Sequence, residues 1–187
     1  MKRYTDALAM TQASVAGQAT DLDTGVRALV ALLRASERVV LIGNGGSLAI
    51  AMHMATDFRT QAGLNAESLG DPVALTAGAN DHGFERVFLP AVATGREAAP
   101  GRVGTLVAMS CSGESRNVVK ATRVALTSGW RVVTMSGFHP TNTIRGVGVD
   151  IGFYVPSSDY GPVQVAHLTI LHTACDELSL PVGVSRE

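Results

Sequence analysis

The feature that most constrains the fold is a set of short, continuous apolar runs. The first covers residues 39–42, is mostly β-branched and ends in glycines, which is typical of a strand buried on both faces. Similar runs predict further strands at 72–76, 105–109, 131–135 and 150–155. Helical patterns separate most of them, at about 47–62, 84–96, 115–128 and 161–178. Alternating strands and helices predict an α/β fold, in which helices cover both faces of a parallel sheet.

Two further helices are expected before this unit. The first covers about residues 4–17, and the second begins at Asp21 or Asp23 as N-cap, ahead of an apolar face. Because they lie outside the alternating unit, they are the natural oligomer interface. The sequence therefore predicts one domain over 1–187, with N-terminal helices in 1–36 and an α/β core at 37–180. Residues 98–102 are expected to form a surface turn rather than a domain boundary.

Composition excludes several classes of function. Hydrophobic residues make up 46% of the chain and charged residues 17%, so disorder is not expected. The net charge of −1 gives no basic surface for nucleic acid or for a membrane. Cys111 and Cys175 fit no CxxC pattern, and the N-terminus lacks the apolar segment of a signal peptide. We therefore expect reduced thiols, a cytoplasmic location, and neither nucleic acid nor membrane as partner.

Two polar loops follow strands of the predicted sheet and each opens a helix. Residues 43–47 read Gly-Asn-Gly-Gly-Ser, and residues 110–115 read Ser-Cys-Ser-Gly-Glu-Ser. Ligands of open parallel sheets bind at the carboxyl ends of strands, and helix N-termini favour anions. Taken alone, the first loop could be a tight strand-to-helix turn and the second a serine-rich N-cap. Because both follow strands of one sheet, together they predict a phosphate-binding site. Neither loop matches the P-loop or the dinucleotide pattern, so a nucleotide is not the preferred ligand.

A second constellation joins two predicted helices. His53 and Asp57 are four residues apart, and Gln164 and His172 are eight apart, so each pair shares one helical face. Two imidazoles, a carboxylate and an amide oxygen could form a zinc site, and the same groups could move protons. A structural role for any one of these histidines is the alternative. His167 falls off this face and is expected in packing or at an interface.

At this point the sequence resembles the sugar isomerase (SIS) domain family, and within it the phosphoheptose isomerases most. The segments that carry the resemblance extend over about residues 5–180: 43–47, 51–53, 80–83, 110–117, and 164–167 with His172.

The resemblance implies a three-layer fold around a five-stranded parallel sheet, and a homotetramer with active sites shared between subunits. It implies conversion of a phosphorylated ketose, sedoheptulose 7-phosphate, to D-glycero-D-manno-heptose 7-phosphate through an enediol. Asp57 and His172 would be catalytic, and one zinc ion per active site would be held by His53, Asp57, Gln164 and His172. The implied substrate-binding residues are Asn44, Gly45, Gly46, Ser47, Asp81, Ser110, Cys111, Ser112, Ser115 and Gln164.

The sequence departs from the family pattern at several of these positions. Asp57 stands in place of glutamate, Gln61 in place of arginine, Cys111 in place of threonine and Glu114 in place of asparagine. Glu114 beside a phosphate has to point away or pair with Arg116. Two alternatives stay open: a non-catalytic SIS module that binds a sugar phosphate or a protein partner, and another sugar-phosphate reaction such as epimerisation or amination.

Overall fold

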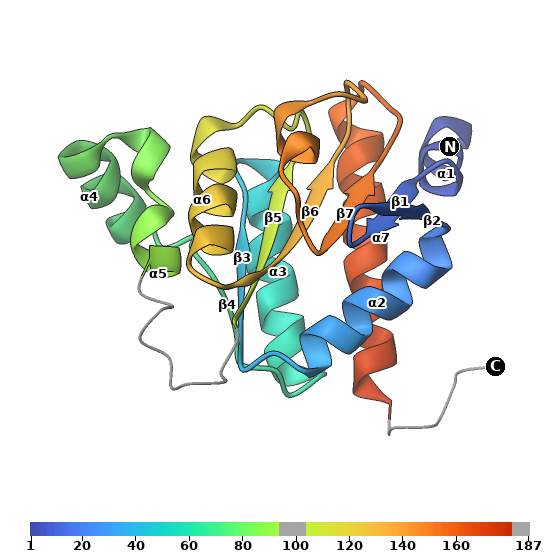
Figure 1. The fold of residues 1–187 in the computed structure, drawn as a ribbon, viewed down its shortest axis with the longest axis horizontal. Coiled ribbons are helices and arrows are strands. Elements are labelled where there is room, and N and C mark those ends of the chain that lie inside the picture. Colours follow the sequence, from blue (N-terminus) through green and yellow to red (C-terminus); the bar gives the residue numbers. More distant parts are fainter. Residues whose placement is uncertain (94–103, 181–187) are drawn as a thin grey trace.

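A computed structural model describes residues 1–93 and 104–180 of the chain (Figure 1). The helices of this part are α1 (Lys2–Ala9), α2 (Leu22–Arg34), α3 (Gly46–Thr60), α4 (Pro72–His82), α5 (Leu89–Ala93), α6 (Arg116–Thr127) and α7 (Tyr160–Ser179), with 3-10 turns η1 (Phe84–Arg86) and η3 (Thr143–Gly146). The strands are β1 (Gln12–Val15), β2 (Gln18–Thr20), β3 (Arg38–Ile42), β4 (Ala66–Ser68), β5 (Gly104–Ser110), β6 (Arg131–Ser136) and β7 (Ile151–Tyr154).

One sheet runs through the molecule in the order β2-β1-β7-β6-β5-β3-β4. The five strands from β7 to β4 are parallel, as expected, and β1 is antiparallel to both β7 and β2. The α/β class is confirmed, but the described sheet has seven strands rather than five. The extra pair comes from a hairpin at the N-terminal end of the chain.

That hairpin corrects the prediction of one helix over residues 4–17. Helix α1 ends at Ala9, and β1 and β2 follow. They are joined by Ala16 and Gly17, both with positive φ (49° and 80°), which is the geometry of a two-residue hairpin turn. The second N-terminal helix is confirmed as α2, and the Asp21 carboxylate caps it by accepting a hydrogen bond from the Thr24 amide at 2.7 Å.

The strand predicted at 72–76 is also wrong. Asp71 accepts a hydrogen bond from the Ala74 amide at 2.8 Å and Pro72 occupies the first turn, so this segment begins α4. None of its residues is fully buried: Leu75 packs at the edge of a hydrophobic cluster, and Val73 is largely exposed. The fifth parallel strand is instead β4, three residues that pair with β3.

The sheet separates two layers of helices. One hydrophobic cluster joins one face of the sheet to α2, α3 and α7, and the other joins the opposite face to α5 and α6. Figure 1 shows α3 and α6 on opposite sides of β3 and β5, with α4 beyond α6 and remote from α7. The helices predicted at 47–62, 115–128 and 161–178 are confirmed as α3, α6 and α7.

The helix predicted at 84–96 is interrupted: η1 and α5 occupy its described part. Residues 94–96 and the turn predicted at 98–102 lie outside the described residues. Within 1–93 and 104–180, no helix is long and apolar enough to cross a membrane.

Candidate active site

The two polar loops lie side by side because β3 and β5 are neighbouring parallel strands. The side-chain amides of Asn44 and Asn117 exchange two hydrogen bonds, of 2.8 and 2.9 Å. Ser47 Oγ lies 3.7 Å from Cys111 Sγ, and both residues are buried. The Gly-Asn-Gly-Gly-Ser loop and the serine loop (residues 110–115) therefore form one continuous surface at the carboxyl edge of the sheet.

Glycines let the first loop approach its neighbours closely. Gly45 has a φ of 53° at the N-cap of α3, a backbone conformation that glycine adopts at little cost. A Cβ on Gly46 would stand 2.5 Å from Gln164 Nε2 and 2.6 Å from Oε1. The Gln164 side chain from α7 thus lies directly on the start of α3, beside the loop that the sequence predicts to bind substrate.

The serine loop contains a chain of hydroxyl contacts. Ser110 Oγ donates to Ser115 Oγ at 3.0 Å and accepts from the Ser115 amide at 3.4 Å, while the Glu114 amide donates to Ser112 Oγ at 3.2 Å. Since Ser112 and Ser115 accept these bonds, their own hydroxyl hydrogens remain to donate. With the first-turn N–H groups of α6, they make a site suited to an anion.

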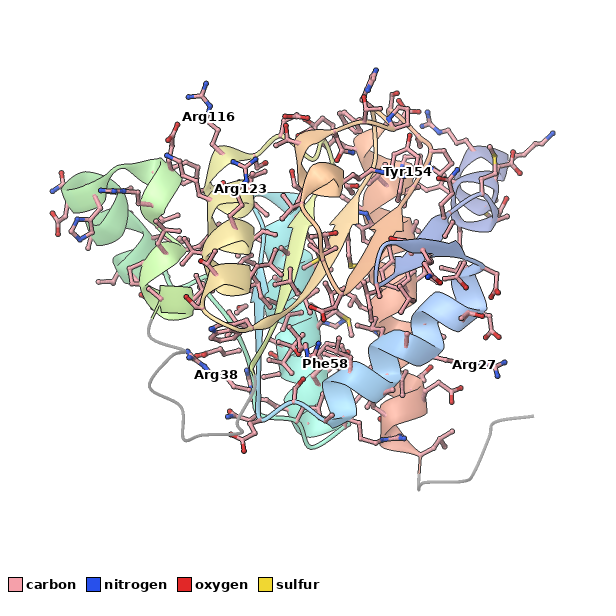
Figure 2. All side chains as sticks on the ribbon, in the orientation of Figure 1. Arg27, Arg38, Phe58, Arg116, Arg123 and Tyr154 are labelled. Atoms are coloured by element: carbon pink, nitrogen blue, oxygen red, sulfur yellow. The ribbon has the colours of Figure 1, made fainter. Side chains whose placement is uncertain are left out.

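Neither ionic side chain next to the loop is directed at this site. Glu114 points away from the loop and does not pair with Arg116; its carboxylate accepts hydrogen bonds from Thr143, which lower its pKa. Arg116 projects outward from the start of α6 and pairs with Glu85 at 3.0 Å (Figure 2). The anion site is therefore built from hydroxyl and amide donors rather than from an arginine or lysine of the described chain.

The second constellation is an imidazole–carboxylate cluster formed by His53, Asp57 and His172. His53 Nε2 lies 3.3 Å from His172 Nε2 and 3.4 Å from Asp57 Oδ2, and His172 Nδ1 lies 3.8 Å from the same carboxylate oxygen. The Asp57 side chain is only 13% exposed, whereas about half of each imidazole is open to solvent. One ligand atom from each residue lies within 4.8 Å of the others, so the cluster could hold a metal ion.

The side chain of Gln164 lies outside this cluster. Its carboxamide lies on Gly46, seven residues before His53 on α3. Because helices α3 and α7 touch both at Gly46–Gln164 and at His53–His172, they run side by side in the same direction. The contact points are about 10–12 Å apart along the helices.

Asp81 is placed differently from the expectation. It lies in the last turn of α4, exposed, rather than in a strand-to-helix loop, and it accepts a hydrogen bond from Asn80 at 2.9 Å. This follows from the helix that replaces the strand predicted at 72–76. Helix α4, which carries Asp81, lies beyond α6 in Figure 1, away from the strands that end in the two loops.

Three other groups have structural positions. His167 is fully buried and bonds the Ser136 carbonyl oxygen at 3.2 Å; burial lowers its pKa to about 4, so it packs as a neutral ring. Burial raises the pKa of the Cys111 and Cys175 thiols, which disfavours a nucleophilic role. Asn117 is the site residue that sequence reasoning left unassigned, although its place in the first turn after the serine loop was a usable signal.

Comparison with known proteins assigns the family. The SIS domain model matches residues 3–137. The chain belongs to the SIS domain family. It is 37% identical over 154 residues to the phosphoheptose isomerase of Geobacter metallireducens, covering 79% of this chain and 78% of the relative. It is 34% identical over 161 residues to the phosphoheptose isomerase of Helicobacter pylori, covering 83% and 81%.

A solved SIS structure agrees with the fold. The phosphoheptose isomerase GmhA from Neisseria gonorrhoeae superposes with a TM-score of 0.76 at 28% identity, covering 95% of this chain and 92% of that one. The seven-stranded arrangement described above is therefore a variant within the SIS fold class rather than a different fold.

Proposed function

We propose that this SIS protein is a phosphosugar isomerase that converts sedoheptulose 7-phosphate to D-glycero-D-manno-heptose 7-phosphate through an enediol. The relatives named phosphoheptose isomerase support the reaction class. The observation that carries it is the shielded Asp57 carboxylate, with one oxygen facing imidazoles from two different helices. Binding a sugar phosphate alone would need only the polar loops, whereas an acid–base cluster beside them is what isomerisation requires.

The donor set fits zinc. Two imidazoles and a carboxylate are typical of catalytic zinc, which keeps a further position for water or substrate. Ligands about 2.0–2.1 Å from a tetrahedral ion stand roughly 3.3–3.4 Å from one another. The two distances from His53 Nε2, 3.3 Å to His172 Nε2 and 3.4 Å to Asp57 Oδ2, match that separation. The third contact, 3.8 Å from His172 Nδ1 to Asp57 Oδ2, is longer and involves the other ring nitrogen, so His172 would have to shift slightly to complete the set. Bound zinc would act as a Lewis acid that polarises the substrate carbonyl. Gln164 would become the fourth ligand only if its carboxamide left Gly46 and turned toward the cluster.

The chain's own residues would move the proton. Asp57 takes the C1 proton of the ketose, and the proton returns to C2 of the enediol after the carbonyl oxygen has been protonated. His172, on the open side of the cluster, exchanges the proton between oxygens.

The polar loops would hold the rest of the substrate. The hydroxyls of Ser112 and Ser115 and the first-turn amides of α6 would receive the phosphate, while Ser110 contributes by donating its own hydroxyl hydrogen to Ser115 Oγ. Asn44, Gly45, Gly46 and Ser47 line the neighbouring part of the site, with Cys111 beneath Ser47. Holding the phosphate at one end of the substrate would place the reacting carbons C1 and C2 at the acid–base cluster. Correct orientation of reacting groups supplies a large part of the rate enhancement of such reactions.

The proposal extends to assembly and location. We propose one domain over 1–187 in a homotetramer with shared active sites, the N-terminal segment 1–36 forming subunit contacts. Asp81 would reach a site only in such an assembly, because α4 is remote from the cluster within one chain. The buried, free thiols Cys111 and Cys175 support a reducing compartment, the cytoplasm.

The decisive experiment is incubation of the purified protein with sedoheptulose 7-phosphate, with and without zinc, followed by NMR of the products. The expected result is the aldose heptose 7-phosphate, formed faster with zinc. If sedoheptulose 7-phosphate binds but no aldose appears in either preparation, the isomerase proposal is wrong and the chain is a non-catalytic SIS module. An epimer would indicate a different reaction on the same fold, and an aminated sugar, formed only when an ammonia donor is added, would do the same.

A further inference from the structure

We propose that Glu114 is a positioning residue that fixes the serine loop for phosphate binding through a clamp on Thr143. The inference rests on the proposed function, because it concerns the same phosphate site. Nothing in the chemistry of a phosphate site calls for a carboxylate in the loop itself, since like charges repel. Its presence in the middle of Ser-Cys-Ser-Gly-Glu-Ser therefore needs a physical reason.

The reason lies in the contacts of the carboxylate. The Thr143 amide donates to Glu114 Oε1 at 2.7 Å, and the Thr143 hydroxyl donates to Oε2 at 2.5 Å. Both carboxylate oxygens are thus engaged by one residue, the first of η3, which belongs to the segment that follows β6. The Glu114–Thr143 clamp joins two loops that are 29 residues apart in the sequence.

The clamp acts on a phosphate-binding hydroxyl through the backbone of Glu114. The Glu114 amide donates to Ser112 Oγ at 3.2 Å, so the same residue holds Ser112 with its main chain and Thr143 with its side chain. Because Ser112 Oγ accepts from this amide, its own hydrogen is directed elsewhere, toward the anion site. Rotation of Glu114 would turn that hydroxyl away from the ligand.

A second set of contacts joins the serine loop to the segment that follows β6. The Ile144 amide donates to the Gly113 carbonyl oxygen at 3.0 Å, and the Gly137 amide donates to the Cys111 carbonyl oxygen at 2.8 Å. The Asn142 carboxamide packs on Gly113, where a Cβ would stand only 2.2 Å from its Cγ. Asn142 Nδ2 in turn donates to the carbonyl oxygens of Gly137 and His139, both at 2.9 Å. These hydrogen bonds therefore hold the segment that carries Thr143 in a fixed position against the serine loop.

The charge of Glu114 also follows from this geometry. The two donors of Thr143 favour the ionised carboxylate and lower its pKa, so the clamp is charged at neutral pH. With both oxygens turned to Thr143, the carboxylate faces the neighbouring loop instead of the anion. Because Glu114 is exposed, we expect a moderate effect on phosphate binding and none on the chemical step.

Four variants of the full-length protein test the clamp. Glu114→Gln replaces one acceptor by a donor, Thr143→Val removes the hydroxyl at nearly constant shape, and Thr143→Ser restores it. Glu85→Gln is the matched control, because Glu85 is a carboxylate of η1 that pairs with the first turns of α6 and makes no contact with the serine loop in the described residues. Binding of inorganic phosphate and of sedoheptulose 7-phosphate is measured by calorimetry, and turnover by the NMR assay.

We expect Glu114→Gln and Thr143→Val to weaken binding of both ligands and raise KM about tenfold, as loss of one charge-assisted hydrogen bond would, with kcat within twofold. Thr143→Ser and Glu85→Gln should behave as wild type. The inference would be overturned if both clamp variants bound the ligands as tightly as the wild type, or if they lost kcat at unchanged KM. It would also be overturned if Glu85→Gln weakened binding equally, or if the wild-type protein bound neither ligand. If the wild-type protein binds the ligands but does not convert sedoheptulose 7-phosphate, only the isomerase proposal is wrong, and the calorimetry still tests the clamp.

Discussion

Replacing Gly46 by alanine adds a single methyl group, which should lower the catalytic activity and leave the stability of the fold unchanged. The glycine opens α3 without a positive φ, so alanine is allowed there by the backbone. An added Cβ would stand 2.5 Å from Gln164 Nε2 and 2.7 Å from Gln164 Cδ, and the side chain of Gln164 can rotate away. Gly46→Ala therefore moves the carboxamide while leaving the helix intact.

The size of the effect follows from these distances. Non-bonded heavy atoms rest about 3.5 Å or more apart, so the carboxamide has to move by roughly 1 Å. A displacement of about 1 Å in a catalytic site can cost roughly a hundredfold in rate. In a helix, alanine is about 0.5–1 kcal/mol more favourable than glycine, which offsets the lost Gln164 contacts. We expect kcat/KM to fall about a hundredfold with a melting temperature close to that of wild type.

Gly43→Ala is the matched control. A Cβ on Gly43 would stand 2.8 Å from the Ser47 carbonyl carbon and 3.0 Å from its oxygen, which are backbone atoms that cannot move without distorting the first turn of α3. This variant should lose stability as well as activity. Thermal unfolding and the isomerase assay on both variants decide the matter. If Gly46→Ala keeps kcat/KM within about threefold of wild type, or unfolds as early as Gly43→Ala, the role given to Gln164 is wrong.

Three further predictions follow from the site and its surroundings. Asp57→Asn keeps the shape of the side chain but removes its charge, so turnover should fall at least about a hundredfold, and equilibrium dialysis should show weaker zinc binding; unchanged turnover removes Asp57 from the mechanism. Ser115→Ala removes a hydroxyl donor and should raise KM about tenfold with kcat retained; a fall in kcat alone would contradict its role. His167 has a pKa of about 4 in the fold against 6.5 as its ordinary value, so only the unfolded chain takes up its proton between these pH values. Stability should therefore drop by about 3 kcal/mol as pH falls from 6.5 to 4, and urea titrations of His167→Leu should lack that part of the pH dependence.

The central strands and their loops could be predicted because their signal is local and strong. Runs such as 105–109 are buried on both faces, and a short apolar segment of this kind that ends in polar or small residues is typical of a central strand. The helical spacing of His53 and Asp57 likewise predicts that both side chains lie on one face of a helix, as they do on α3. The edge of the sheet carries no such signal, since β4 has only three residues and one of them is buried.

Two errors had visible signals that the apolar pattern outweighed. Asp71-Pro72 is a helix start, yet residues 72–76 also make a short apolar run. Ala16-Gly17 is a hairpin turn, yet the flanking residues fit a helix. The contacts of Gly46 with Gln164 and of Glu114 with Thr143 had no signal at all, because each joins segments that only the fold brings together.

The acid–base cluster forms around a carboxylate that is one methylene shorter than the glutamate of the family pattern. Aspartate in place of glutamate at position 57 leaves two alternatives, a backbone that has moved to compensate or a changed chemistry. In the structure, Asp57 Oδ2 lies 3.4 Å from His53 and 3.8 Å from His172. Helices α3 and α7 run together from the Gly46–Gln164 contact to the His53–His172 contact, and the absence of a side chain on Gly46 leaves room for the Gln164 carboxamide. The shorter carboxylate therefore lies within 4 Å of both imidazoles in this backbone, and the pairing of α3 with α7 connects the glycine-rich loop to the acid–base cluster.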